Sequence, residues 1–361
     1  MKETIIIESF QGHYEVEFCE NLAKVGLFSR SRNFEYFILA DKKVWELYNV
    51  LFEKLKDCPV YLVEVNEEAK SLHGVNDFSN WLITSGATKS ATILAIGGGV
   101  IQDIATFTAH IYKRGVKWEY LPTTLLSQAD SCIGAKCGIN VMPYKNQIGV
   151  LHSPSKVWVV SEFLKTLDDK TFESGYGEIL KLSLTPPHSF YLELQKELSD
   201  NGIVRSHALK WIYLSLRAKQ AIIEADEYEK DHRRILNYGH SFGHALEGIS
   251  GNSVNHGSGV LFGIDLINYL SVEWGILDRR VFKDIRNTIA SNFSLDFLPK
   301  ELTALSLVNA LKTDKKVLSG FIHFAVINNS MELVITPKSI DSHLLNLVER
   351  YITNDCIFTT S

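Results

Sequence analysis

The sequence has few cysteines and no excess of positive charge. Five irregularly spaced cysteines (Cys19, Cys58, Cys132, Cys137 and Cys356) among 361 residues are typical of reduced thiols rather than of a disulfide framework. Lysine and arginine total 37 against 42 aspartate and glutamate residues, which gives a formal net charge of −5. Because nucleic-acid-binding proteins need a broad basic face, this balance argues against a nucleic-acid partner.

Long apolar runs are also absent. The segment MKETIIIESF has only three consecutive isoleucines, between Glu3 and Glu8, and lacks the basic flank of a signal peptide. No apolar run approaches the roughly 18 residues of a membrane span. We therefore expect a cytoplasmic protein with no membrane partner. Its length and its 45% of apolar residues predict a folded chain of about two domains.

The order of apolar and amphipathic segments predicts an α/β fold. Before residue 160, the strand-like runs YFILAD, VYLVEV, ATILAIGG and KWEYLP alternate with helical patterns such as KKVWELYNVLFEKL and GVNDFSNWLI. This alternation is typical of βαβ units and predicts a parallel-sheet domain over residues 1–160. Long helical patterns follow, so we expect a mainly α-helical domain over residues 161–361.

Two hairpins and a final helix complete the predicted organisation. TIIIES and HYEVEF flank a turn that contains Gly12, which predicts an opening hairpin. FIHFAVI and MELVIT flank residues 328–330 and predict a second hairpin near the end of the chain. The segment HLLNLVERYI predicts a closing helix.

A glycine run lies between a predicted strand and a predicted helix. GGGVIQD, residues 97–103, begins with the last two glycines of ATILAIGG and directly precedes IATFTAHIY. Glycines at such a turn let backbone N–H groups approach a pyrophosphate at the helix N-terminus. The spacing is not GxGxxG, so the ordinary dinucleotide fingerprint is absent, and a simple tight turn with Asp103 near the helix start remains an alternative.

Small polar residues and two lysines follow the next strand. The stretch LPTTLLSQADSCIGAKCGIN, residues 121–140, is followed closely by a second lysine and an asparagine. Lysine supplies a compact point charge, which suits a phosphorylated ligand, although a solvated loop would have similar composition. The candidate residues are Thr123, Thr124, Asp130, Lys136, Asn140, Lys145 and Asn146.

A third group contains metal-ligating residue types: Glu178, His240, His244 and His256. His240 and His244 are four residues apart and therefore share one helix face. Position 241 is Ser, so the inner glutamate of the helical zinc motif is missing. Two histidines, a carboxylate and an open position form a familiar catalytic zinc arrangement, but the spacing alone does not say which two histidines bind.

Cations precede the three histidines of this group. A helical pattern over residues 209–229 carries Lys219, and the turn KDHRR that follows ends in Arg233 and Arg234, just before Asn237. These cations could clamp an anionic substrate or belong to a solvated basic turn.

Taken together, the motifs resemble the 3-dehydroquinate synthases of the sugar phosphate cyclase group, over nearly the whole chain. The resemblance depends on GGGVIQD, YKRG, PTTLLSQADS, the run from Lys136 through GIN to Asn146, YGEILK, AKQAIIEADEYEK, RRILNYGHSFGHALE, NHG and TDKKVLSG. It implies a Rossmann-like NAD domain, a helical domain that binds zinc or cobalt, and an active site in the cleft between them.

The resemblance also assigns roles to individual residues. It implies Glu178, His240 and His256 as metal ligands, and Lys219 and Arg233 as a clamp for a substrate carboxylate. Substrate-phosphate contacts would be Lys136, Asn146, Asn237, His244 and Lys316, with Arg114 supplied across a homodimer interface. Lys181 and Asp130 match further active-site positions. NAD contacts would be Asp41, Glu67, Lys70, Gly98, Gly99, Asp103, Thr123, Thr124, Lys136 and Lys145.

In the family that this sequence resembles, the metal polarises the oxygen of a ring hydroxyl of the substrate, and NAD takes a hydride from that alcohol group. The substrate then loses a proton and inorganic phosphate. NADH then returns the hydride, the ring opens and an intramolecular aldol step closes the carbocycle. The implied substrate is 3-deoxy-D-arabino-heptulosonate 7-phosphate, a phosphorylated sugar acid, and the products are 3-dehydroquinate and phosphate. This chemistry would place the protein in the shikimate pathway of aromatic amino acid biosynthesis.

The chain departs from the family pattern near the implied ligands. Gln102, Ala135 and Tyr144 occupy positions where glycine is usual, and Cys137 occupies a position where threonine is usual. The pair Ser258-Gly259 follows His256-Gly257 where Glu-Ala is usual. A side chain at a glycine position costs space and backbone freedom. The alternatives are a paralogous cyclase that makes another cyclitol or an amino-dehydroquinate, a metal-dependent polyol or glycerol dehydrogenase, and a catalytically silent homologue.

Overall fold

The computed structural model describes residues 4–29, 35–141, 144–187, 189–251, 253–312, 317–318 and 321–360. The chain forms two compact units. The N-terminal unit comprises Met1–Asp168 and Arg205–Tyr228, and the C-terminal unit comprises Asp169–Val204 and Glu229–Ser361. Residues 205–228, which the sequence placed in the second domain, thus pack with the first unit. The boundary near residue 160 between an NAD-binding and a metal-binding domain stays a prediction.

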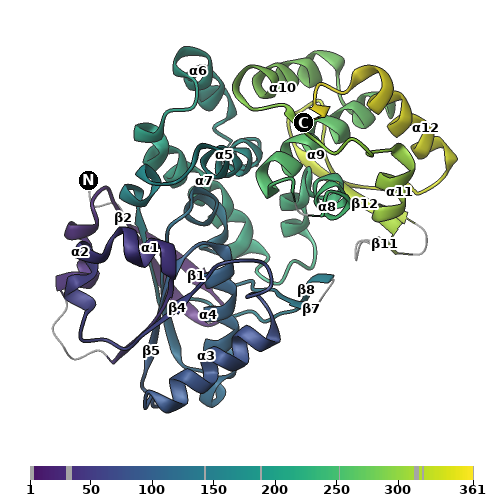
Figure 1. The fold of residues 1–361 in the computed structure, drawn as a ribbon. Helices are drawn as coiled ribbons and strands as arrows, with labels where there is room; N and C mark the ends of the chain where they lie inside the picture. The colour runs from purple at the N-terminus through teal and green to yellow at the C-terminus, as the bar shows by residue number, and fades with distance from the viewer. Residues whose placement is uncertain are drawn as a thin grey trace. The chain divides into compact units, whose positions relative to one another are not determined.

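The N-terminal unit is built on a parallel sheet, as predicted (Figure 1). Within the described residues its strand order is β1-β2-β9-β6-β5-β3-β4, and only the opening hairpin of β1 and β2 is antiparallel. The strands are β1 (Thr4–Ser9), β2 (Gly12–Cys19), β3 (Tyr36–Asp41), β4 (Val60–Val63), β5 (Thr92–Gly97), β6 (Lys117–Pro122) and β9 (Lys156–Val160). A separate small ribbon pairs β7 (Ile139–Val141) with β8 (Tyr144–Ile148).

The central strands are apolar runs because helices cover the sheet. Every residue of β5 is buried, and β3 is buried from Tyr36 to Ala40, as is typical of parallel strands. The helices of this unit are α1 (Lys42–Leu47), α2 (Asn49–Phe52), α3 (Leu72–Thr84), α4 (Gly99–Ile111) and α7 (Ala208–Ala225). The helix predicted over KKVWELYNVLFEKL is interrupted at Tyr48, whose side-chain hydroxyl donates to the carbonyl of Glu162.

The predicted helix over residues 209–229 ends four residues early. Helix α7 stops at Ala225, and Asp226 leaves the helical conformation. Glu229 has a positive φ of 56°. The apolar residues at helical spacing end with Ile222 and Ile223, so the charged DEYEK segment has no buried face to extend the helix.

The C-terminal unit is mainly helical, as predicted. Its centre is α9 (His256–Glu273), which is buried from Gly257 to Ser271 and packs against α5, α8 and α10. The other helices are α5 (Asp169–Ser183), α6 (Tyr191–Asn201), α8 (His240–Ile249), α10 (Arg279–Asn292), α11 (Ala304–Lys312) and α12 (Ser342–Arg350). The strands are β10 (Asp296–Leu298), β11 (Val317–Leu318), β12 (Phe321–Ile327), β13 (Leu333–Ser339) and β14 (Thr359–Thr360).

The later elements also agree with the sequence. β12 and β13 pair in antiparallel register as the predicted second hairpin, and α12 is the predicted closing helix. All five cysteines carry free thiols. Among the described residues, no helix combines the length and the apolar character that crossing a membrane requires.

Candidate active site

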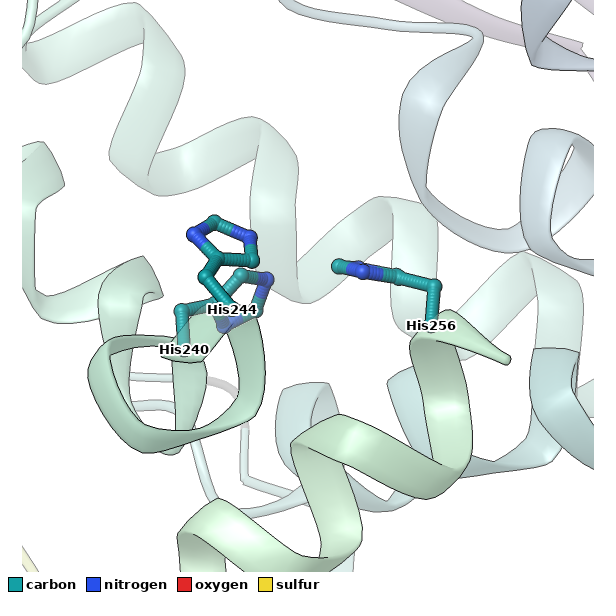
Figure 2. Close-up of side chains that lie close together, drawn as sticks. All are labelled: His240, His244 and His256. Carbon is teal, nitrogen blue, oxygen red and sulfur yellow. The ribbon is translucent and has the colours of Figure 1, made fainter. Parts of the chain in front are cut away.

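Three helices of the C-terminal unit bring a carboxylate and two imidazoles together. The Nε2 atoms of His240 and His256 lie 3.3 and 2.9 Å from the same oxygen, Oε1 of Glu178. His240 and His256 are the first residues of α8 and α9, and Glu178 lies in α5. Figure 2 shows the ring of His256 pointing toward those of His240 and His244. Residues 78 apart in sequence thus converge on one point.

The opposite ring nitrogens have their own partners. Nδ1 of His240 donates to the carbonyl of Tyr238 at 3.1 Å, and Nδ1 of His256 donates to Oε1 of Glu247 at 2.9 Å. With Nδ1 engaged as the donor to these partners, Nε2 is the nitrogen that can offer its lone pair once a metal ion takes the place of any proton there, as in metal-binding histidines. Both Nε2 atoms therefore face the Glu178 oxygen in ligand orientation.

Charge keeps Glu178 ionised although its side chain is fully buried. Burial raises the pKa of this carboxyl, but Lys181, whose Nζ lies 2.5 Å from Oε2, and the two imidazoles lower that pKa well below its ordinary value. Burial, with Lys181 nearby, lowers the pKa of His240 and favours its neutral form. Burial also lowers the pKa of His256, but Glu178 and Glu247 outweigh it and raise that pKa to about 10.

Glycines let the three helices approach this closely. A Cβ added at Gly257 would collide with the carbonyl oxygen of Ser174 and lie 2.5 Å from its carbonyl carbon. A Cβ at Gly239, where φ is 78°, would lie 2.8 Å from the carbonyl oxygen of Val260. Because these glycines adjoin His256 and His240 in sequence, the backbone contacts that they permit set the separation of the two rings.

The side chains present here fit a divalent metal. Neutral imidazole nitrogens and a carboxylate are the ligands of catalytic zinc sites, which keep a further position open. His244 also presents a ring nitrogen, because one ligand atom each from His240, His244 and His256 lie within 4.8 Å of one another. The two candidates for the third ligand differ in burial, since His244 is exposed and Glu178 is buried. The resemblance implies Glu178 as the third ligand.

In the N-terminal unit, predicted cofactor residues meet at one edge of the sheet. Asp41 ends β3, Gly98 and Gly99 follow β5, and Thr123 and Thr124 follow β6, which are three adjacent strands. Gly98 caps α4 without a side chain, so first-turn N–H groups of the helix remain available to an anion. A Cβ on Gly99 would meet nothing within 4 Å, and one on Gly98 would lie 3.0 Å from Thr124. This open edge fits a dinucleotide phosphate.

The remaining predicted cofactor contacts are linked to one another. Nζ of Lys70 lies 2.6 Å from Oδ2 of Asp103, and the amide of Gly138 donates to Oδ1 of Asp103. Glu67 accepts a 2.7 Å hydrogen bond from Asn140, and Nζ of Lys145 lies 3.9 Å from the Glu67 carboxylate. Burial raises the pKa of Asp103, while Lys70 opposes the shift. Asp41 caps α1 by accepting from the amide of Lys43.

Another ion pair connects the π-helical segment Ser127–Ser131 with α7. Nζ of Lys219 lies 2.7 Å from Oδ1 of Asp130 and donates to the Asp130 carbonyl at 2.6 Å. Gln102, which replaces a glycine of the family pattern, forms hydrogen bonds with the last residue of this π-helical segment. Its Nε2 donates to the carbonyl of Ser131, and its Oε1 accepts from the Ser131 hydroxyl, both at 2.6 Å.

We expect Gln102→Ala to lower the free energy of unfolding by about 2 kcal/mol, because two hydrogen bonds are lost and the Ser131 carbonyl loses this partner. Urea unfolding measures the change. Gln147→Ala is the control, since Gln147 is exposed and, within the described residues, its side chain donates only to a carbonyl two residues away; its effect should stay within about 0.5 kcal/mol. Equal unfolding midpoints for the two variants would contradict a fastening role.

The residues implied in substrate binding lie in both units. In the N-terminal unit, Lys136, Asn146 and Arg114 are exposed, and Ala135 next to Lys136 adopts a left-handed φ of 60°. In the C-terminal unit, Arg233 is buried, and Asn237 donates to Oε1 of Glu229 at 2.6 Å. Lys316 lies outside the described residues.

Sequence reasoning missed two carboxylates, Glu247 beside His256 and Glu229 beside Asn237. Glu247 stands three residues after His244, on the same helix face, and this spacing was the available signal. Glu229 had no comparable signal, because it follows the end of α7 in a non-helical conformation.

Solved structures with the same architecture show the fold to which the chain belongs. A 2-deoxy-scyllo-inosose synthase complexed with carbaglucose-6-phosphate, NAD⁺ and Co²⁺ is similar with a TM-score of 0.85 and 21% identity, over 96% of this chain and 99% of that one. The 2-epi-5-epi-valiolone synthase of Streptomyces hygroscopicus subsp. jinggangensis 5008, with NAD⁺ and Zn²⁺ bound, has a TM-score of 0.81 and 26% identity, over 93% and 97%. The fold is that of dehydroquinate synthase-like α/β proteins.

Sequence comparison then gives the family. The profile of the 3-dehydroquinate synthase N-terminal region matches residues 60–174, and that of the C-terminal region matches residues 175–317. A 3-dehydroquinate synthase of Dictyoglomus thermophilum is 33% identical over 98% of this chain and 97% of its own length. The chain belongs to the 3-dehydroquinate synthase family of sugar phosphate cyclases, as its motifs suggested, and is an enzyme of this cyclase class.

Proposed function

We propose that this enzyme converts 3-deoxy-D-arabino-heptulosonate 7-phosphate to 3-dehydroquinate and inorganic phosphate, with NAD as a cofactor that is regenerated in each turnover. The observation that carries the proposal is the convergence of His240 and His256 on the Glu178 carboxylate in a chain of this family. The likeness to a curated 3-dehydroquinate synthase over nearly the full chain supports the choice of substrate.

Glu178, His240 and His256 would hold the divalent ion, zinc or cobalt. Such an ion supplies Lewis-acid polarisation of a substrate oxygen. Glu178 contributes the negative charge, and the Nδ1 partners of both rings hold their Nε2 atoms toward it. Lys181 keeps this carboxylate ionised and unprotonated.

The N-terminal unit would hold NAD. Gly99 leaves open space at the N-terminus of α4 for the pyrophosphate, and Gly98, the N-cap of that helix, lies against the Thr124 side chain. Thr123 and Thr124 would lie beside the pyrophosphate. Asp41 would accept a ribose hydroxyl, as its position after β3 suggests. Further contacts would come from Glu67, Lys70, Asp103, Lys136 and Lys145.

Cationic and amide side chains would orient the substrate. Lys219 and Arg233 would bind the carboxylate, and Asp130 would fix the Lys219 ammonium through their ion pair. Phosphate contacts would be Lys136, Asn146, Asn237, His244 and Lys316, with Arg114 supplied by a second subunit of a homodimer. Holding one conformer of the substrate among these groups is catalysis by orientation and electrostatic preorganisation.

A turnover assay tests the proposal. Metal-loaded enzyme with catalytic NAD receives the heptulosonate 7-phosphate, phosphate release is followed, and the carbon product is identified by mass and NMR. We expect phosphate and 3-dehydroquinate in equal amounts without accumulation of NADH. Turnover of a hexose 6-phosphate without a carboxylate, but not of the heptulosonate, would favour another cyclase, and stoichiometric NADH from a polyol would favour a dehydrogenase.

Arg233→Ala tests the carboxylate clamp. We expect kcat/KM for the carboxylate-bearing substrate to fall about 100-fold, because a buried charge-assisted contact is lost. The neighbouring Arg234→Ala is the matched control and should change kcat/KM little. If the Arg233 variant instead loses affinity for inorganic phosphate as strongly as for the substrate, the clamp is assigned to the wrong anion.

A further inference from the structure

Glu247 is a buried carboxylate that the proposed reaction does not use. Glu247 lies in α8, and only 8% of the residue is exposed. It stands in the last turn of the helix, where the helix dipole disfavours a negative charge. An ionisable residue that is buried at an unfavourable helix end needs a compensating partner.

The partner is the imidazole of His256. Oε1 of Glu247 lies 2.9 Å from Nδ1 of His256, while Nε2 on the opposite side of the ring lies 2.9 Å from Glu178. The Glu247 side chain also lies beside Gly259, one turn into α9: a Cβ added there would lie 3.4 Å from both Cγ and Oε1 of Glu247, at van der Waals contact. The ring is thus fixed between two carboxylates from α5 and α8.

We propose that Glu247 is a positioning residue for the metal site: it holds the proton of His256 on Nδ1 and fixes the ring so that Nε2 serves as the ligand atom. The inference deepens the proposed function and rests on the metal role of His256. A carboxylate behind a ligating histidine selects its tautomer, orients its ring and raises its basicity. His240 receives a weaker version of this support from the neutral carbonyl of Tyr238.

Co²⁺ binding provides a readout that is independent of turnover. The purified full-length enzyme and its variants are freed of metal and titrated with Co²⁺ against a competing chelator, and the visible absorption of bound Co²⁺ is recorded. We expect Glu247→Ala to weaken Co²⁺ affinity about 10- to 100-fold and to change the spectrum. Glu247→Gln keeps an acceptor oxygen but loses the charge, so its loss should be smaller, about three- to tenfold.

Two further variants separate the explanations. Glu349→Gln removes the same charge from an exposed position of the same unit and should bind Co²⁺ as the native enzyme does. His256→Ala reports whether His256 is a ligand at all. Circular dichroism and the thermal midpoint of each variant identify a general loss of structure, and Glu247→Gln is retained as the test if the alanine variant fails to fold.

The outcomes are distinct. If His256→Ala abolishes tight Co²⁺ binding while Glu247→Ala and Glu247→Gln bind with native affinity and spectrum, the positioning role is overturned and the metal site stands. If native enzyme and His256→Ala bind Co²⁺ equally, the metal role of His256 in the proposed function fails, and the role of Glu247 fails with it. Graded losses from Gln to Ala, with the Glu349 control unchanged, support the proposal.

Discussion

We expect His256→Ala to lose stoichiometric tight metal and to lower turnover by about 1,000-fold or more. The substitution removes one of two imidazole ligands together with its hydrogen bonds to Glu178 and Glu247. Loss of an outer-shell partner alone costs 10- to 100-fold in many metal sites, so loss of a ligand should cost more. Metal content after dialysis and the rate of phosphate release measure the two effects.

The control is His343→Ala, because His343 is an exposed histidine of the same unit. This variant should retain native metal content and activity. The secondary structure of His256→Ala should also persist, since His256 is only the first residue of α9 and the helix cap is the Asn255 side chain. Retention of one tightly bound metal per His256→Ala chain would remove this residue from the ligand set.

The sheet was predictable because its signal is local. Buried runs such as YFILAD carry their strand character in six consecutive residues, and their alternation with amphipathic segments indicated parallel pairing. The end of α7 was less predictable. A charged segment after Ala225 is compatible with a solvated helix, but the segment contacts the opening hairpin instead. Glu227 accepts a hydrogen bond from the Ser9 hydroxyl, and the ring of Tyr228 packs against that of Phe10.

The metal site was predictable in part. Helical spacing places His240 and His244 on one face, but it does not identify Glu178 or His256, which come from other helices. Residue type placed all four in one candidate group, and only the resemblance chose Glu178, His240 and His256 among them. The approach of α5 and α9 depends on Gly257 meeting the backbone of Ser174, a tertiary contact that has no periodic signal in the sequence.

Two departures from the family pattern, Gln102 and Ala135, show why a substituted glycine position is hard to interpret from sequence. A glutamine at a glycine position suggested crowding near the cofactor. In the structure, however, both polar atoms of the Gln102 side chain form hydrogen bonds with Ser131. At Ala135 the backbone keeps the left-handed conformation that glycine adopts without cost, so this chain accepts some strain beside Lys136.

Gly257→Ala should destabilise the C-terminal unit by about 3 kcal/mol or more and weaken metal binding with it. The added methyl group would overlap backbone atoms of Ser174, including Cα at 2.6 Å, and backbone cannot rotate away as a flexible side chain could. Helices α5 and α9 must therefore separate, which moves His256 away from Glu178. Thermal or urea unfolding and Co²⁺ affinity measure the two consequences.

Gly248→Ala is the matched control for this variant. Gly248 also lies in a helix, α8, but a Cβ there would meet nothing within 4 Å. Alanine at such a site should be neutral or stabilise the protein by about 0.5–1 kcal/mol, because it reduces the freedom of the unfolded chain. Opposite signs for the two glycine-to-alanine changes are expected if close helix packing positions the ligands. Native stability and metal affinity in Gly257→Ala would show that α5 and α9 separate without cost and that the ligand geometry does not depend on this contact.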